Sequence, residues 1–418
     1  MELPTYPETE SGPAQLRHAA AHGDEGAVKL LLERQDIDPN AADAKYNRTP
    51  LFWAVEQGHE GVVKLLLQRE DIDPNTIDIK YGITPLDQAA RQGREGMVKL
   101  LLGREDISLN TPDAESHWTP LTIAAWAGHE GVVKLLLDRD GIDPNAGDLI
   151  GGGTPLYHAA KMGNEGVVKL LLERKDVSPD IANTQYNITP LWGAVEKGHE
   201  GIVKLLLERT DIDPNTRETR CGRTPLWWAA AQGLEGVVKL LLERDDINPN
   251  TPDTKHHLTP LLWAAERGNE GVVKLLLKHR DLDPEIRGPT GQTALEAAAL
   301  RNHAGIVQLL SQRTPSPPLQ GYPALEASEP HAGCLRRSVP PDCVCLSIFL
   351  FVLLCMFTIP LIINACSPPR PEVTPTWYIP LGQTCQCGQG SHHIVGGWCF
   401  RCLCDREPTM LVATTNCT

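Results

Sequence analysis

The residues of this 418-residue chain most suited to chemistry are cysteines and histidines near its C-terminal end. Three cysteines and two neighbouring histidines, Cys387, Cys399, Cys402, His392 and His393, have spacings that could bind Zn²⁺. Oxidised, the same cysteines could instead form a small disulfide knot. Seven cysteines follow position 363: Cys366, Cys385, Cys387, Cys399, Cys402, Cys404 and Cys417. The odd count would leave one thiol for an intermolecular bridge.

Cysteine usage separates the chain into two parts. Cys221 is the one cysteine before Cys334, which is typical of a protein kept in a reducing compartment. If the tail lies in an oxidising compartment, disulfides are favoured over zinc, because a zinc site would need reduced thiols. A tail without ordered structure is the third alternative.

Other ionisable residues recur at one fixed interval, which favours a structural role. His59, His129 and His199 share one position, and the glutamates that follow them begin helices, where the helix dipole favours acidic residues. We find no G-x-S-x-G, P-loop or H-E-x-x-H motif. We therefore expect no enzyme, no cofactor and no metal site in this part of the chain.

Net charge bears on the class of partner. The formal charge is −14, and the first 313 residues hold 34 Lys and Arg against 47 Asp and Glu. An acidic body argues against a nucleic-acid partner, whose phosphates it would repel.

The recurring residues belong to a sequence repeat. Thr-Pro-Leu begins at seven positions 35 residues apart: Thr49, Thr84, Thr119, Thr154, Thr189, Thr224 and Thr259. Degenerate copies at Ala14 and Thr293 extend the array to about nine units over residues 14–313, after an N-terminal segment 1–13.

The residue pattern within each unit predicts two helices and a loop. Thr84 is expected to cap a helix that starts at Pro85 and ends near Gln92, where Gly93 supplies a left-handed residue. A second helix follows, as in residues 60–67, with a wide apolar stripe. The polar segment after it, up to the next threonine, is predicted to form a finger loop. Leu66→Ala is expected to cost roughly 2–5 kcal/mol.

Helix, turn, helix, finger loop and T-P-L closely resemble the ankyrin-repeat family, as does the phrase TPLFWAVEQGHEGVVKLLL. These units are longer than the usual repeat of about 33 residues and resemble the long arrays common in filamentous fungi. The histidine that usually follows T-P-L is absent, so its hydrogen-bonding role is in doubt. The resemblance implies an all-α solenoid that binds proteins through its finger loops and the concave face of its first helices.

Residues that differ between units are the candidates for contact with a partner. We expect nine finger and first-helix residues to bind it: Tyr46, Arg48, Tyr81, Arg91, Trp118, Trp126, Lys161, Tyr186 and Arg220. Trp53, Trp228 and Trp263 share one register position and are interpreted as packing between repeats. Trp192 and Trp227 fit either role.

After the array the composition changes. Residues 314–343 form a Pro-rich linker, residues 344–363 form an uncharged stretch long enough to cross a bilayer as one helix, and residues 364–418 form the Cys-rich tail. Arg336 and Arg337 precede the stretch, and Arg370 follows it. This balance favours a cytosolic array and a lumenal or extracellular tail.

These features predict a scaffold that binds a protein partner of unknown identity and is tethered to a membrane by a single span. An alternative is a single-pass receptor or adaptor whose disulfide-bonded tail senses an external signal. A zinc-dependent enzyme of the ubiquitin-ligase type fits least well, because the tail lacks the eight-ligand pattern of such a domain.

Overall fold

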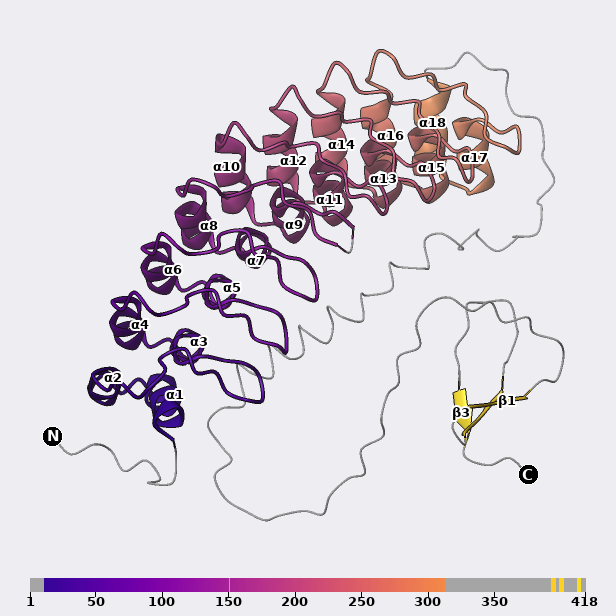
Figure 1. The fold of residues 1–418 in the computed structure, drawn as a ribbon. Helices are drawn as coiled ribbons and strands as arrows, with labels where there is room; N and C mark the ends of the chain where they lie inside the picture. The colour runs from indigo at the N-terminus through magenta and orange to yellow at the C-terminus, as the bar shows by residue number, and fades with distance from the viewer. Residues whose placement is uncertain (1–10, 150, 313–391, 396–397, 402–411, 415–418) are drawn as a thin grey trace, which may run out of the picture. The chain divides into compact units, whose positions relative to one another are not determined.

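The computed structural model describes residues 11–149, 151–312, 392–395, 398–401 and 412–414. The chain divides into two units, residues 1–324 and 325–418. The described part of the first unit holds eighteen helices in nine pairs (Figure 1). The first helices of the pairs are α1 Gly12–His22, α3 Pro50–Gln57, α5 Pro85–Arg91, α7 Pro120–Ala127, α9 Pro155–Met162, α11 Pro190–Lys197, α13 Pro225–Gln232, α15 Pro260–Arg267 and α17 Ala294–Leu300. The second helices are α2 Glu25–Leu32, α4 Glu60–Leu67, α6 Glu95–Leu102, α8 Glu130–Leu137, α10 Glu165–Glu173, α12 Glu200–Leu207, α14 Glu235–Leu242, α16 Glu270–Leu276 and α18 Ala304–Ser311.

The first helices begin and end as the sequence predicts. The Thr49 hydroxyl accepts the N–H of Phe52 (3.2 Å), and Pro50 occupies the first helical position. Gly58 ends the helix with a φ of 92°, a left-handed conformation that glycine adopts without steric cost. Thr84 caps α5 in the same way. The prediction of a helix, a tight turn and a second helix is confirmed.

The second helices supply half of the core. In α4, Val62, Val63 and Leu66 are fully buried, while Lys64 is exposed, as the amphipathic pattern predicts. First helices pack against first helices of the neighbouring units, and second helices against second helices. The result is the two helical layers of a solenoid (Figure 1).

The Glu-Gly that opens the second helices from α2 to α16 has a packing role that the sequence did not reveal. Gly61 lies against the carboxylate of Glu25 from the preceding unit, where a Cβ atom would collide. Gly96 lies in the same way against Glu60. Each carboxylate therefore sits beside the N-terminal turn of the next second helix, where its charge is favoured.

The recurring histidines join neighbouring units. His59 Nε2 lies 3.0 Å from the Ala21 carbonyl oxygen, at the C-terminal end of the preceding first helix. Asn164 replaces the histidine in its unit and donates to two such carbonyls, of Ala125 (2.8 Å) and Trp126 (2.9 Å). The structural interpretation of this position is confirmed, because the side chain satisfies helix-end carbonyls that lack partners within their own helix.

The described part of the second unit is a three-stranded antiparallel sheet, which the sequence did not predict. Its strands are β1 His392–Val395, β2 Trp398–Arg401 and β3 Val412–Thr414, in that order. Val395 pairs with Trp398 at the β1–β2 turn, and Cys399 in β2 pairs with Thr414 in β3.

No helix among the described residues is long and apolar enough to cross a membrane. The predicted span at 344–363 and the predicted linker at 314–343 lie outside the described residues. So do Cys387 and Cys402, and the choice between disulfides and zinc in the tail stays a prediction.

Candidate functional site

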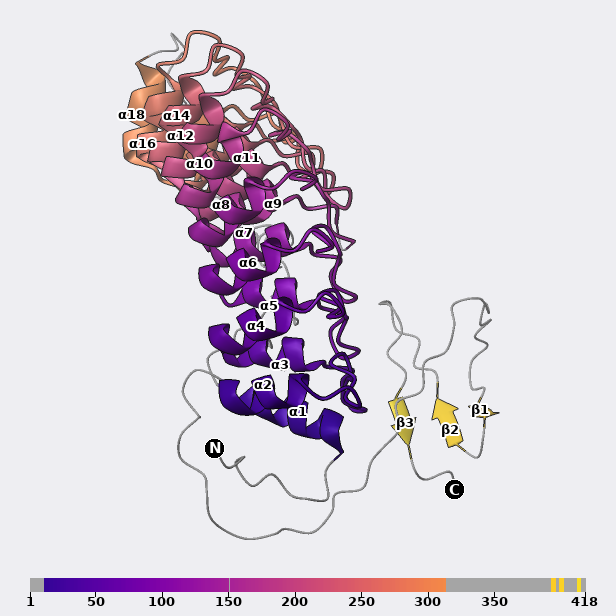
Figure 2. The ribbon, with the colours of Figure 1, turned by 60° about the vertical axis from the view of Figure 1, so that its left-hand side comes forward.

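The finger loops and the first helices form one continuous surface, which we call the finger face. Its loops are residues 41–48, 76–83, 111–118, 146–153, 181–188, 216–223 and 251–258. Figure 2 shows them in a row beside the first helices, on the side away from the second helices. All nine predicted contact residues lie in these fingers or in the first helices, and Arg48 alone among them is buried.

Each finger folds around a buried or half-buried acidic or amide side chain. Asp78 is fully buried, and its Oδ1 accepts the backbone N–H groups of Tyr81 (3.1 Å) and Ile83 (3.2 Å). Asn183 Oδ1 accepts the equivalent N–H groups of Tyr186 and Ile188, both at 3.0 Å. The equivalent residues are Asp43, Asp78, Asp113, Asp148, Asn183, Glu218 and Asp253.

Sequence reasoning missed these residues, although they recur every 35 positions and that interval was the signal that could have found them. Backbone hydrogen bonds then link adjacent fingers, as from Ile79 N–H to the Tyr46 carbonyl (2.9 Å) and from Thr219 N–H to the Tyr186 carbonyl (2.9 Å). The fingers are therefore held at fixed spacing, and the side chains that they carry are preorganised.

Arg48 is a predicted contact residue that the structure places inside the array. Its side chain is 9% exposed and forms ion pairs with Glu56 (2.9 Å) and with Asp78 of the next finger (3.3 Å). The guanidinium also lies 5.1 Å from the centre of the Tyr46 ring. Burial raises the pKa of Glu56, against the opposing effect of Arg48. Arg48 therefore binds two units of the array together, and Tyr46, half-buried above it, is the accessible member of the pair.

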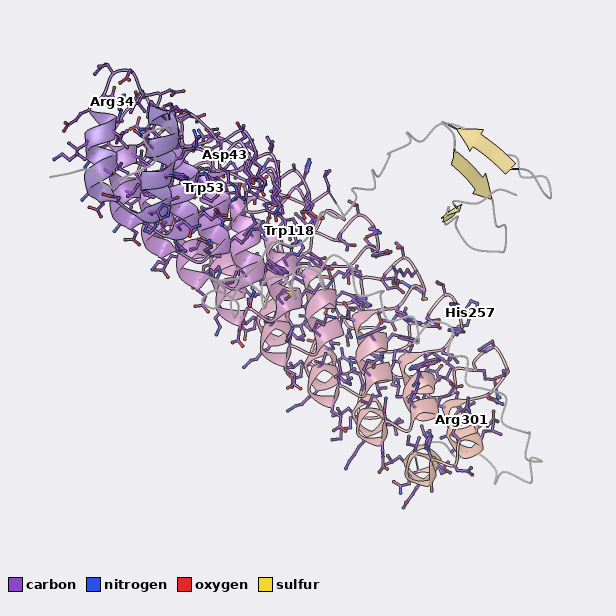
Figure 3. All side chains as sticks on the ribbon, turned by 90° about the horizontal axis from the view of Figure 1, so that it is seen from below. Arg34, Asp43, Trp53, Trp118, His257 and Arg301 are labelled. Atoms are coloured by element: carbon purple, nitrogen blue, oxygen red, sulfur yellow. The ribbon has the colours of Figure 1, made fainter. Side chains whose placement is uncertain are left out.

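Trp118 and Trp126 come together as a cluster at the middle of the finger face. Their ring centres are 5.5 Å apart, and His158 lies 4.8 Å from Trp118. Both indoles are half-buried, and the Trp118 indole N–H has no acceptor among the described residues. Figure 3 marks Trp118 on the array.

The histidine of this cluster is fixed by a carboxylate. His158 Nε2 lies 2.7 Å from Asp148 Oδ2. Burial alone would raise the pKa of Asp148, but the hydrogen bond and charge of His158 leave it lowered. The aromatic cluster is thus held rigid by a finger carboxylate.

The remaining predicted residues lie along the same face, mostly in pairs. Arg220 lies over the Tyr186 ring at 4.0 Å, and the Arg91 guanidinium lies 3.9 Å from Asp113. Lys161 donates to the Tyr157 hydroxyl (3.3 Å). Tyr81 is half-buried in its finger, with the Lys80 ammonium 4.5 Å from its ring.

Four other tryptophans of the array pack in pairs between repeats. Trp192 lies 5.4 Å from Trp228, and Trp227 lies 5.2 Å from Trp263, each pair joining consecutive first helices. Trp192 is 4% exposed and Trp227 is fully buried, so both have a packing role. Trp53 Nε1 donates to Asp43 Oδ2 (3.2 Å), and Figure 3 shows these two residues close together.

Other features of the described residues do not suggest a reaction centre. No group of three or more His, Cys, Asp or Glu among them could hold a metal ion. A pocket of about 550 Å³ lies between α4 and α6, lined by Glu60, Lys64, Lys99 and Leu100. It belongs to the second-helix layer, away from the aromatic and basic side chains of the finger face.

Comparison with known proteins identifies the array. The family model described as ankyrin repeats (three copies) matches residues 8–78, 77–148, 148–218, 178–253 and 249–320. No curated protein matches the chain. The matched residues hold the paired helices of the array, and threonine caps begin its first helices from α3 to α17. The chain therefore belongs to the ankyrin-repeat family.

Proposed function

We propose that the finger face binds a protein partner and that a membrane segment outside the array holds the complex at a membrane. Ankyrin repeats generally mediate protein–protein interaction and are generally binding scaffolds without enzymatic activity. The observation that carries the proposal is the cluster of Trp118, Trp126 and His158. Half-buried aromatic side chains on a rigid surface are the residues that most often dominate binding energy.

The remaining candidate contacts surround that cluster. Tyr81 and Arg91 lie on one side of it along the array, and Lys161, Tyr186 and Arg220 lie on the other. These polar and basic groups are suited to the rim of an interface, where they select the partner more than they strengthen binding.

Binding of protein partners should be compared between the full chain and Trp118→Ala/Trp126→Ala, with Lys99→Ala/Lys134→Ala as the control. The control residues are exposed on the second helices. Quantitative pull-down should show at least a tenfold loss of specific partners for the tryptophan variant and no change for the control. Urea unfolding of both variants checks that the array stays folded. Retention of every partner by a folded tryptophan variant would show that this cluster is not the binding surface.

The membrane tether rests on residues 344–363, a run of twenty residues without a charge. Such a run matches the length of a helix that crosses the hydrocarbon core, which is about 30 Å thick. The basic residues Arg336 and Arg337 before it favour an array on the cytosolic side.

A further inference from the structure

Arg223, the last residue of the finger 216–223, is a buried cation that no carboxylate of the described residues pairs with. The residue is 5% exposed, and its Nε and Nη2 atoms have no hydrogen-bond acceptor among the described residues. Its guanidinium lies 4.5 Å from the Trp227 ring centre and 5.9 Å from that of Trp228. Cation–π contacts offset part of the lost hydration, but a buried charge normally also has a counter-charge.

Arg48 occupies the same register position five units earlier and does have its counter-charges. It pairs with Glu56, eight residues later, and with Asp78, thirty residues later. Relative to Arg223, those two positions hold Ala231 and Asp253.

Neither position neutralises Arg223. Alanine has no carboxylate. Asp253 is fully buried, and its two oxygens accept the N–H groups of His256 (3.1 Å) and Leu258 (2.9 Å) of its own finger. Within the described ranges no ion pair joins Asp253 to Arg223. The carboxylate that closes the site around Arg48 is therefore missing from the site around Arg223.

A second hydrogen-bond donor beside Arg223 lacks an acceptor as well. Trp53, in the Arg48 unit, donates its indole N–H to Asp43. The equivalent tryptophan here is Trp228, whose indole N–H has no acceptor among the residues that the structure describes. Glu218, the equivalent of Asp43, accepts the backbone N–H groups of Arg220 (2.6 Å), Cys221 (2.8 Å) and Arg223 (3.3 Å) but not the indole N–H of Trp228.

The surroundings are suited to an acidic ligand. The finger 216–223 carries Arg217, Arg220 and Arg223 against the single acidic residue Glu218, although the array as a whole is acidic. Arg220 is exposed beside Tyr186, where it can attract an acidic segment toward the buried guanidinium.

We propose that Arg223 and Trp228 form a receptor site for a glutamate or aspartate side chain of an acidic protein segment bound on the finger face. The incoming carboxylate takes the place that Glu56 holds around Arg48 and accepts from the guanidinium. A guanidinium binds a carboxylate through parallel hydrogen bonds, which adds orientation to charge. The inference rests on the proposed binding function and specifies the chemistry of the partner.

The site can be tested with a displayed library of random twelve-residue peptides, from which peptides that bind the full chain are selected. Recovered peptides are expected to share one acidic position. Changing that residue to glutamine should weaken binding at least tenfold, as should Arg223→Met. Ala231→Glu should weaken it similarly, because the new carboxylate fills the site from within. Lys134→Met, at an exposed position of the second helix α8, is the control and should leave the affinity unchanged.

Several outcomes would overturn the inference. They are peptides without a shared acidic position, full affinity in Arg223→Met, or tighter binding when phosphoserine replaces the acidic residue. Loss of partners in Trp118→Ala/Trp126→Ala together with retention in Arg223→Met would leave the binding function standing and reject this site alone.

Thermal unfolding without any ligand gives a second, independent test. Arg223→Met and Ala231→Glu are each expected to raise Tm, since one removes an unpaired buried charge and the other neutralises it. Arg48→Met is expected to lower Tm, because it leaves Asp78 buried without its counter-charge. A lowered Tm for both Arg223→Met and Ala231→Glu would show that Arg223 is already neutralised within the protein.

Discussion

Asp87 is a fully buried carboxyl group at the position where the family usually has histidine. Its Oδ2 accepts the N–H (2.8 Å) and the hydroxyl (2.7 Å) of Thr84, whereas its Oδ1 has no partner among the described residues. Burial raises the pKa of Asp87 to about 7, although the hydrogen bonds from Thr84 lower it. Asp87 therefore makes hydrogen bonds to the threonine cap from the position where the histidine is missing, at the cost of burying a carboxyl group.

This pKa predicts the pH dependence of stability. A carboxyl group whose pKa is higher in the folded than in the unfolded protein favours folding when protonated. The free energy of unfolding should therefore fall as pH rises from about 4 to about 7, by up to roughly 4 kcal/mol from this group. Asp87→Asn removes the titration, so the stability of the variant relative to wild type should increase from pH 5 to pH 8 in urea unfolding. A constant difference between the two proteins across that range would contradict the assignment.

At the scale of residues, the sequence predicted contacts between residues close in the chain and missed contacts between residues far apart in it. The helix cap at Thr84 could be predicted from its immediate neighbours, because a capping side chain bonds to a backbone group three residues away. Arg48 and Arg223 occupy the same position of the repeat, and the sequence differs eight residues later, where one unit has Glu56 and the other Ala231. Only the structure shows that this position and Asp78 of the next finger meet the Arg48 side chain.

At the scale of elements, one unit lacks a contact that the others have. Leu234 stands where the equivalent His59, Asn164 and Asn269 bind carbonyls of the preceding first helix. The end of α11, next to Leu234, receives no such hydrogen bond from a leucine side chain. Leu234→Asn should add this link and raise the free energy of unfolding by about 1 kcal/mol.

The matched control for this change is Asn269→Leu, which should lower the free energy of unfolding by a similar amount. Urea unfolding followed by circular dichroism measures both variants. If Leu234→Asn is no more stable than wild type while Asn269→Leu is destabilised, the apolar contacts of Leu234 outweigh the missing hydrogen bond.

The sequence repeat made the helices predictable, whereas the strands near the C-terminus lie outside the repeat and were not predicted. The bounds of α4 match the predicted 60–67, because the apolar stripe and the flanking residues recur in every unit. The strands β1, β2 and β3 are three or four residues long and occur once each, so no repeated pattern marked them. Trp118 and Trp126 were predicted as partner contacts because they vary between units, and the finger carboxylates were missed because that criterion passes over positions that recur.

At the scale of the array, each unit packs against its neighbouring units, so the loss of stability caused by a core substitution should be confined to the units around it. Leu66 is fully buried in α4, which packs against α2 and α6. Leu66→Ala should cost roughly 2–5 kcal/mol and should increase hydrogen exchange in the units around α4 more than in α15–α18. Uniform loss of protection along the array would show that it unfolds as a single cooperative body.

At the scale of the whole chain, the position of the array at a membrane depends on residues 344–363. Membranes from cells that express the full chain, or a chain ending at Arg313, should be extracted with alkaline carbonate. The full chain is expected to remain in the pellet and the shorter chain to be released, since only the first retains the uncharged run.

Protease added to sealed vesicles then determines orientation. With Arg336 and Arg337 on the cytosolic side, the array should be digested and residues 364–418 protected. Protection of the tail would place its seven cysteines in an oxidising compartment and favour disulfides over zinc. Release of both chains by carbonate would eliminate the tether and leave the finger face as the whole of the proposed function, because the binding proposed there rests on Trp118, Trp126 and Arg223, which all lie within the array.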